Sequence, residues 1–132
     1  MKFHRPNPHW RPSTPEVTDH SLDDLLEQLP AIAIHFWATW NGVDPPMGRN
    51  IGKIADTFAG RIRFYSCDVD TTPGSELGVR FGIVSVPTLA VFRRGQKPCL
   101  IIGFREPWKL AERLDEILSK KCVHPWWAFW RR

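Results

Sequence analysis

The chain has 132 residues, of which 42% are hydrophobic and 24% are charged, values typical of one soluble globular domain. The net charge of +4 comes from the end of the chain, because residues 1–119 carry 14 basic and 14 acidic side chains, and the remaining basic residues are Lys120, Lys121, Arg131 and Arg132. A body without a basic face disfavours nucleic-acid binding.

The ends and the cysteines indicate a compartment. The N-terminus has positive charges but no apolar run behind them, so we expect neither a secretory signal nor an anchor, and no window approaches the roughly 18 apolar residues of a membrane span. The three cysteines form no CxxC and no metal-ligand spacing; they are Cys67, Cys99 and Cys122. This pattern predicts a reducing interior, by default the cytoplasm, with no metal site and no cofactor.

The first elements follow from prolines and apolar spacing. Residues 1–20 contain four prolines and predict an extended arm. Ser21 is typical of an N-cap, and we expect a short helix from there through Gln28, which Pro30 ends. Ala31–Trp37 is an almost continuous apolar run, the pattern of a strand that is covered on both faces.

The rest of the chain alternates between helix and strand. After residues 36–44, apolar residues recur at helical spacing up to Gly60. A second strand is expected over residues 62–69, parallel to the first after a right-handed crossover. A short helix is expected over residues 73–80. The strands 88–92 and 99–104 form a hairpin around a turn at 94–96, and a last helix begins at Pro107. No internal repeat is visible.

The segment after the first strand carries the main functional information. It reads Phe-Trp-Ala-Thr-Trp-Asn-Gly-Val-Asp over residues 36–44, and the chain later has Asp-Val-Asp at 68–70, Val-Pro-Thr at 86–88 and Gly95 in the hairpin turn. Together these features resemble thioredoxin over roughly residues 21–119. The resemblance implies a thioredoxin fold, an α/β architecture with a central mixed β-sheet flanked by helices and a cis-proline at Pro87 that faces the motif loop. It divides the chain into an arm (1–20), a thioredoxin-like domain (21–119) and a basic aromatic tail (120–132).

The motif departs from the family at the positions that carry its chemistry. Where thioredoxins read Trp-Cys-Gly-Pro-Cys, this chain has Asn41 and Asp44, and His35 stands where many members have a buried Asp. An amide and a carboxylate can neither attack a disulfide nor resolve a mixed one, so we predict no catalytic residues here. His35 is expected to be a core histidine that is hydrogen-bonded to backbone or water, rather than a ligand or a general base.

The start of the helix after the motif is a second departure. Asp44 followed by Pro45 and Pro46 reads as an N-cap and the first helical positions, so the helix is predicted to begin near Pro45. The alternative begins it at Asn41 and loses hydrogen bonds at both prolines.

A cysteine pair elsewhere is not expected to replace the motif. By the family's strand order, two strands separate Cys67 from Cys99, which is too far for a disulfide. Cys122 lies beside Lys121 and His124, a setting that can lower a thiol pKa, and it is the thiol to test for reactivity. The alternative is an unreactive cysteine.

Two surfaces remain for binding. The resemblance implies a groove for extended peptide, in which strand addition needs only exposed backbone and apolar flanks; its residues are Trp40, Ser85, Val86, Pro87 and Gly103. The tail offers Trp126, Trp127 and Trp130, which suit the domain's own surface first, then a protein partner and, less favoured, a membrane surface. Packing of Trp40 on its own loop, with no partner, is the alternative for the groove.

These observations favour a redox-inactive binding or adaptor domain that engages a protein or peptide partner. Two alternatives stay open: a thiol-disulfide oxidoreductase in redox homeostasis that acts through Cys122, and a structural subunit of an assembly. Sequence identifies neither the partner nor the oligomeric state.

Overall fold

The computed structural model describes residues 6–17 and 19–119 of the chain, for residues 19 and 20 the backbone only. Helices and strands follow one another in the order α1 (Asp19–Gln28), β1 (Ala31–Trp37), α2 (Asp44–Ala55), the 3-10 turn η1 (Asp56–Phe58), β2 (Arg63–Asp68), α3 (Thr72–Arg80), β3 (Thr88–Arg93), β4 (Cys99–Ile102) and α4 (Pro107–Ser119).

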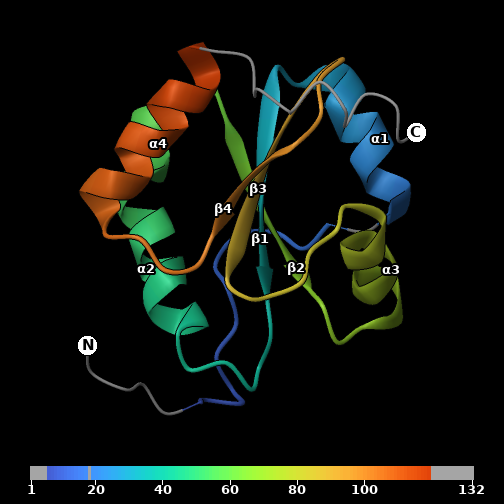
Figure 1. The fold of residues 1–132 in the computed structure, drawn as a ribbon, viewed down its shortest axis with the longest axis vertical. Helices are drawn as coiled ribbons and strands as arrows, with labels where there is room; N and C mark the ends of the chain where they lie inside the picture. The colour runs from blue at the N-terminus through green and yellow to red at the C-terminus, as the bar shows by residue number, and fades with distance from the viewer. Residues whose placement is uncertain (1–5, 18, 120–132) are drawn as a thin grey trace.

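The strands form one mixed sheet in the order β2-β1-β3-β4. β1 runs parallel to β2 and antiparallel to β3, and β4 is antiparallel to β3. All seven residues of β1 are buried, as its continuous apolar run predicts for a strand between two covered faces. Figure 1 shows α2 and α4 on one side of the sheet and α1 and α3 on the other. The predicted mixed sheet flanked by helices is confirmed.

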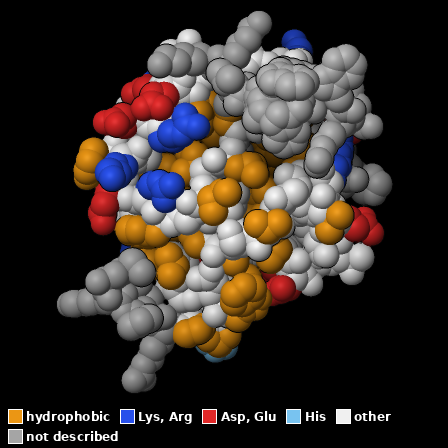
Figure 2. All heavy atoms as spheres, viewed as in Figure 1, with side chains coloured by type: hydrophobic (Ala, Val, Ile, Leu, Met, Phe, Trp, Pro, Cys, Tyr) orange, Lys and Arg blue, Asp and Glu red, His pale blue; other side chains and the backbone are white. Residues whose placement is uncertain are grey.

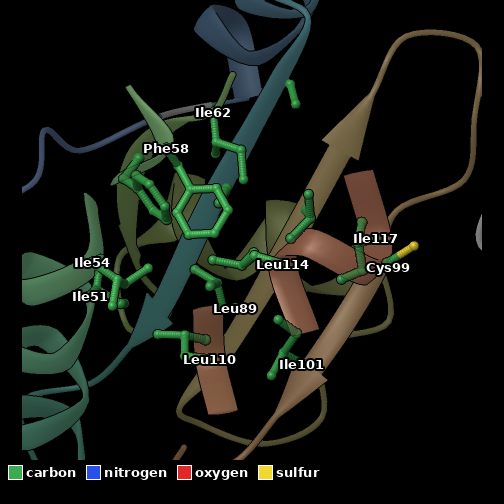
Figure 3. Packing of buried hydrophobic residues seen from close by; sticks show 14 of the residues in the cluster. Ile51, Ile54, Phe58, Ile62, Leu89, Cys99, Ile101, Leu110, Leu114 and Ile117 are labelled. Atoms are coloured by element: carbon green, nitrogen blue, oxygen red, sulfur yellow. The ribbon is translucent and has the colours of Figure 1, made fainter. Parts of the chain in front are cut away.

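Each face of the sheet has its own hydrophobic core. The core under α2 and α4 is shown in Figure 3, where Leu110 and Leu114 of α4 point toward Leu89 of β3. The second core lies under α1 and α3, and its buried members are Val17, Leu22, Ile32, Ile34, Phe36, Tyr65, Cys67, Leu77, Ala90 and Phe92. Alternate residues of β1 enter the two cores, which explains why this strand carries almost no polar side chain.

Several predicted boundaries shift. α1 begins at Asp19, so Ser21 lies inside the helix and the prediction that it is the N-cap is wrong. β4 ends at Ile102, two residues earlier than expected, because Gly103 adopts φ +88, which breaks the extended backbone. The Val86–Pro87 peptide bond, just before β3, is cis.

The end of the arm is attached to the sheet. Val17 N–H donates to Ser66 C=O at 2.8 Å, and Ser66 N–H donates to Pro15 C=O at 2.8 Å, which places Glu16 beside Ser66 as a parallel bridge on β2. The arm therefore pairs with the outer edge of β2 at Ser66 before α1 begins.

Candidate functional site

The motif loop connects the carboxyl end of β1 to α2 and lies at the lower end of the sheet in Figure 1. Its two tryptophans have opposite environments. Trp37 is buried and its indole Nε1–H donates to Glu16 Oε1 at 2.8 Å, whereas Trp40 is 60% exposed. Of the two tryptophans, Trp40 is therefore the one whose side chain a partner could reach.

His35 and Asp44 form a buried pair beneath the loop. His35 Nε2 lies 2.9 Å from Asp44 Oδ1, and the two side chains are 1% and 0% exposed. The other carboxylate oxygen of Asp44 accepts a hydrogen bond from Ala38 N–H at 3.0 Å. The expectation that His35 bonds to backbone or water is wrong, because its partner is the carboxylate that occupies the second cysteine position of the motif.

This pair also corrects the predicted helix cap. α2 begins at Asp44, the preceding Val43 has helical dihedrals (φ −88, ψ −19), and no side chain caps the helix. Asp44 is not the cap, because its two oxygens bond backward to His35 and Ala38. The two prolines do fall in the first turn, and the helix begins after Asn41, so the later of the two predicted starts is the closer one.

Asn41 links the motif loop to the loop before β3. Its Nδ2 donates to Val86 C=O at 2.5 Å, while its Oδ1 accepts from Val43 N–H at 2.8 Å. Both ends of the amide are therefore engaged, one inside the motif loop and one across the site. The sequence predicts that Asn41 lies in the loop, but no local pattern indicates this contact with a residue 45 positions away.

The predicted groove residues lie around this contact. Ser85 is exposed, Val86 and Gly103 are half-buried, and Pro87 is buried. Three successive carbonyls are bonded within the protein: Ser85 C=O accepts from Thr88 Oγ1, Val86 C=O from Asn41, and Pro87 C=O from Gly103 N–H. Within the described part of the chain, no group accepts a hydrogen bond from Val86 N–H.

Exposed apolar side chains accompany the groove residues in sequence. Val84, two residues before Val86, is 89% exposed, and Trp40 belongs to the motif loop. Figure 2 shows hydrophobic side chains across the front face, including its lower part, where Figure 1 places the motif loop. The site thus combines apolar surface with one free backbone donor.

The described cysteines offer no reactive thiolate. Burial, with help from the charges of Glu16 and Asp68, raises the pKa of the Cys67 thiol to about 12. Cys99 is disulfide-bonded. Cys67 on β2 and Cys99 on β4 have β1 and β3 between them, as predicted. The predicted reactive thiol, Cys122, lies outside the described residues, as do the tail tryptophans Trp126, Trp127 and Trp130.

The arm contributes residues that sequence reasoning missed. The Trp10 ring lies 5.5 Å from that of Trp37, edge to face, and 6.3 Å from that of His35, so the arm covers the buried pair. Glu16 accepts hydrogen bonds from Trp37 Nε1–H, Ser66 Oγ–H and Asp68 N–H. An aperiodic proline-rich segment gives no signal for such contacts, although an acid before the first helix is a polar group that needs a partner if it is covered.

The described residues contain neither a metal-binding cluster nor a membrane-spanning helix. Residues 6–17 and 19–119 contain no group of three or more His, Cys, Asp or Glu side chains placed to hold a metal ion. In the same part of the chain, no helix has the length and apolar character needed to span a membrane.

The geometry agrees with comparisons to known proteins. A family model described as Thioredoxin matches residues 13–116. The chain belongs to the thioredoxin family. Relatives include a thioredoxin of Staphylococcus aureus (strain Mu50), 32% identical over 103 residues that cover 78% of this chain and 96% of the relative. A thioredoxin of Synechocystis sp. is 28% identical over 107 residues, covering 80% and 98%.

Solved structures of thioredoxins have the same fold. The mitochondrial thioredoxin 3 of Saccharomyces cerevisiae in its oxidised form has a TM-score of 0.70 at 26% identity, covering 79% of this chain and 95% of that one. Chloroplastic thioredoxin z has a TM-score of 0.69 at 20% identity, covering 85% and 100%. The thioredoxin fold implied by the motif is thereby confirmed for this family member.

Proposed function

We propose that this thioredoxin-family chain is a binding or adaptor domain without disulfide exchange activity, which engages an extended peptide or protein partner through the groove of Trp40, Ser85, Val86, Pro87 and Gly103. The tail residues Trp126, Trp127 and Trp130 are proposed as a second contact with the same partner, in the cytoplasm.

The observation that carries the proposal is the environment of the two motif positions. Asn41 and Asp44 are both hydrogen-bonded within the domain, and Asp44 is completely buried against His35. Thiol-disulfide exchange needs a thiolate that a disulfide can reach, and neither position supplies one. Peptide binding by strand addition does not need a thiol, so the groove can keep this function.

A redox assay tests the first half of the proposal. We expect the purified chain to leave the rate of insulin precipitation by dithiothreitol unchanged. The Asn41→Cys/Asp44→Cys double variant is the matched comparison, because it supplies the two missing thiols in the same fold. Acceleration by the unaltered chain would contradict a redox-inactive domain.

A second candidate function is favoured by the relatives, which are named thioredoxins. By kind they favour a thiol-disulfide oxidoreductase, here acting through Cys122, whose thiol would first have to be released from any disulfide with Cys99. Insulin reduction that disappears in Cys122→Ser would establish this alternative.

Substitutions of two tryptophans with similar exposure test the groove. Trp40 is 60% exposed on the motif loop, and Trp108 is 63% exposed on α4, where it lines a separate hollow with Arg61 and Glu112. In affinity capture from a cell extract, Trp40→Ala is expected to reduce recovery of the bound partner about tenfold or more, as for a central aromatic anchor. Trp108→Ala is expected to leave recovery unchanged. Equal recovery with both variants would exclude the groove.

A further inference from the structure

Asn41 occupies the backbone acceptor that a peptide strand would use in the groove. Its Nδ2–H donates to Val86 C=O at 2.5 Å, and its orientation is fixed because Oδ1 accepts from Val43 N–H at 2.8 Å. The amide cannot rotate away from Val86 without losing both hydrogen bonds.

The other backbone groups of residues 85–87 offer a peptide few positions for hydrogen bonding. A strand that pairs with one residue of a sheet edge can exchange two hydrogen bonds with it, one with its N–H and one with its C=O. The N–H of Val86 has no acceptor among the described residues, but its C=O is bonded to Asn41. The neighbouring carbonyls of Ser85 and Pro87 are bonded to Thr88 and Gly103. A peptide therefore finds one free donor, and each of the three carbonyls already accepts one hydrogen bond from within the protein.

We propose that Asn41 is an autoinhibitory contact of the groove: an extended peptide that pairs with Val86 has to compete with the Asn41 amide for Val86 C=O. This inference rests on the proposed peptide-binding function and adds a regulation of the same site. Binding includes the cost of one broken internal hydrogen bond, so the groove selects segments whose flanking contacts, for example with Trp40, compensate for it.

Two variants remove the contact in different ways. Asn41→Asp keeps an oxygen that can accept from Val43 N–H but removes the donor to Val86, and Asn41→Ala removes both. The matched control is Asn50→Asp, because Asn50 Nδ2–H makes the same type of bond, to Arg105 C=O at 2.8 Å, away from residues 85–87. Denaturant unfolding checks that all three variants fold.

The probe is a set of 12-residue, cysteine-free peptides, acetylated and amidated at their ends, selected from a phage library on the Asn41→Asp variant. We expect these peptides to bind Asn41→Asp and Asn41→Ala roughly two- to tenfold more tightly than the unaltered chain, the effect of one competing hydrogen bond. Asn50→Asp should bind like the unaltered chain. In NMR titrations of the unaltered chain, the Asn41 side-chain amide protons should shift as peptide binds.

The outcomes separate this inference from the proposed function. Peptides that bind the Asn41 variants and the unaltered chain equally, or that bind the unaltered chain while its Asn41 amide signals stay in place, overturn the autoinhibitory contact and leave peptide binding intact. A peptide bound in the groove should bind less tightly when Trp40 is replaced by alanine. If no peptide selected on the Asn41 variants or on the unaltered chain shows this loss, the groove function is refuted, and the inference is refuted with it.

Discussion

A carboxylate in the second cysteine position of the motif changes what the core must satisfy. A thiol can be buried with few hydrogen bonds, but a buried carboxylate needs donors. Asp44 has two, the ring of His35 and the N–H of Ala38. His35 and Asp44 therefore form one unit, and each explains the presence of the other in the interior.

Removing either member of this unit leaves the other without its partner, so the losses from the two removals should not add. Asp44→Ala or His35→Ala leaves a buried polar group without its partner and should lower the free energy of unfolding by about 2–5 kcal/mol. The double variant should lose less than the sum of the two, and urea unfolding of the four proteins measures this coupling. As a control, Asp115→Asn breaks an exposed pair with Arg61 and should cost no more than about 1 kcal/mol. Strict additivity would show that the two side chains do not act together.

The pair illustrates the limit of reading single residues. The resemblance placed His35 at the family's buried-acid position and Asp44 at a motif cysteine, yet the partner of each was assigned separately. The sequence predicts a backbone or water partner for His35 and a helix-capping role for Asp44, and it does not pair the two residues. The contact joins a strand residue to the first residue of the next helix, and no hydrophobic period connects these two positions.

At the scale of elements, the packing of the arm on α2 depends on one glycine. A Cβ at Gly48 would lie 2.6 Å from Cζ2 of Trp10, whereas a Cβ at Gly52 of the same helix would have nothing within 4 Å. Because alanine is a better helix former, Gly52→Ala should stabilise the chain by about 0.5–1 kcal/mol. Gly48→Ala should instead destabilise it by about 1–3 kcal/mol through overpacking.

The effect of Gly48→Ala on stability should change from destabilising to stabilising when the Trp10 side chain is removed. In the Trp10→Ala background, Gly48→Ala is expected to become stabilising, like Gly52→Ala in either background. Thermal unfolding of the six proteins measures both effects. Stabilisation by Gly48→Ala in the unaltered chain would mean that Trp10 does not pack against this helix.

Strands and helices were largely predictable, and the arm was not. β1, α3 and α4 agree closely with the apolar spacing, because both faces of β1 and one face of each helix enter a core. The arm has no such period. Its attachment depends on particular polar contacts of Glu16 with β2 and Trp37, which become defined only when distant segments meet.

At the scale of the whole molecule, stability should depend on the protonation of Cys67. Its pKa is raised from 9.0 to about 12 in the folded chain. Below pH 9 the thiol is protonated in the folded and the unfolded chain, so the stability of the folded chain does not depend on this group there. Above pH 9 the unfolded chain releases the proton first, and stability falls by about 1.4 kcal/mol per pH unit until the folded pKa is reached. Comparing urea unfolding of the unaltered chain and Cys67→Ala between pH 8 and 10.5 isolates this slope. If the free energy of unfolding changed with pH in the same way for both proteins, the raised pKa of Cys67 would be contradicted.

The bridge between Glu16 and Ser66 has a consequence for association between molecules. A sheet with both edges open can accept a neighbouring strand at each edge, and such contacts, repeated between copies, produce open-ended chains. The arm pairs with one edge of this four-stranded sheet, at Ser66 of β2. A strand of another copy could pair along this edge only by displacing the arm, so the arm protects the edge at Ser66 in addition to covering the buried histidine.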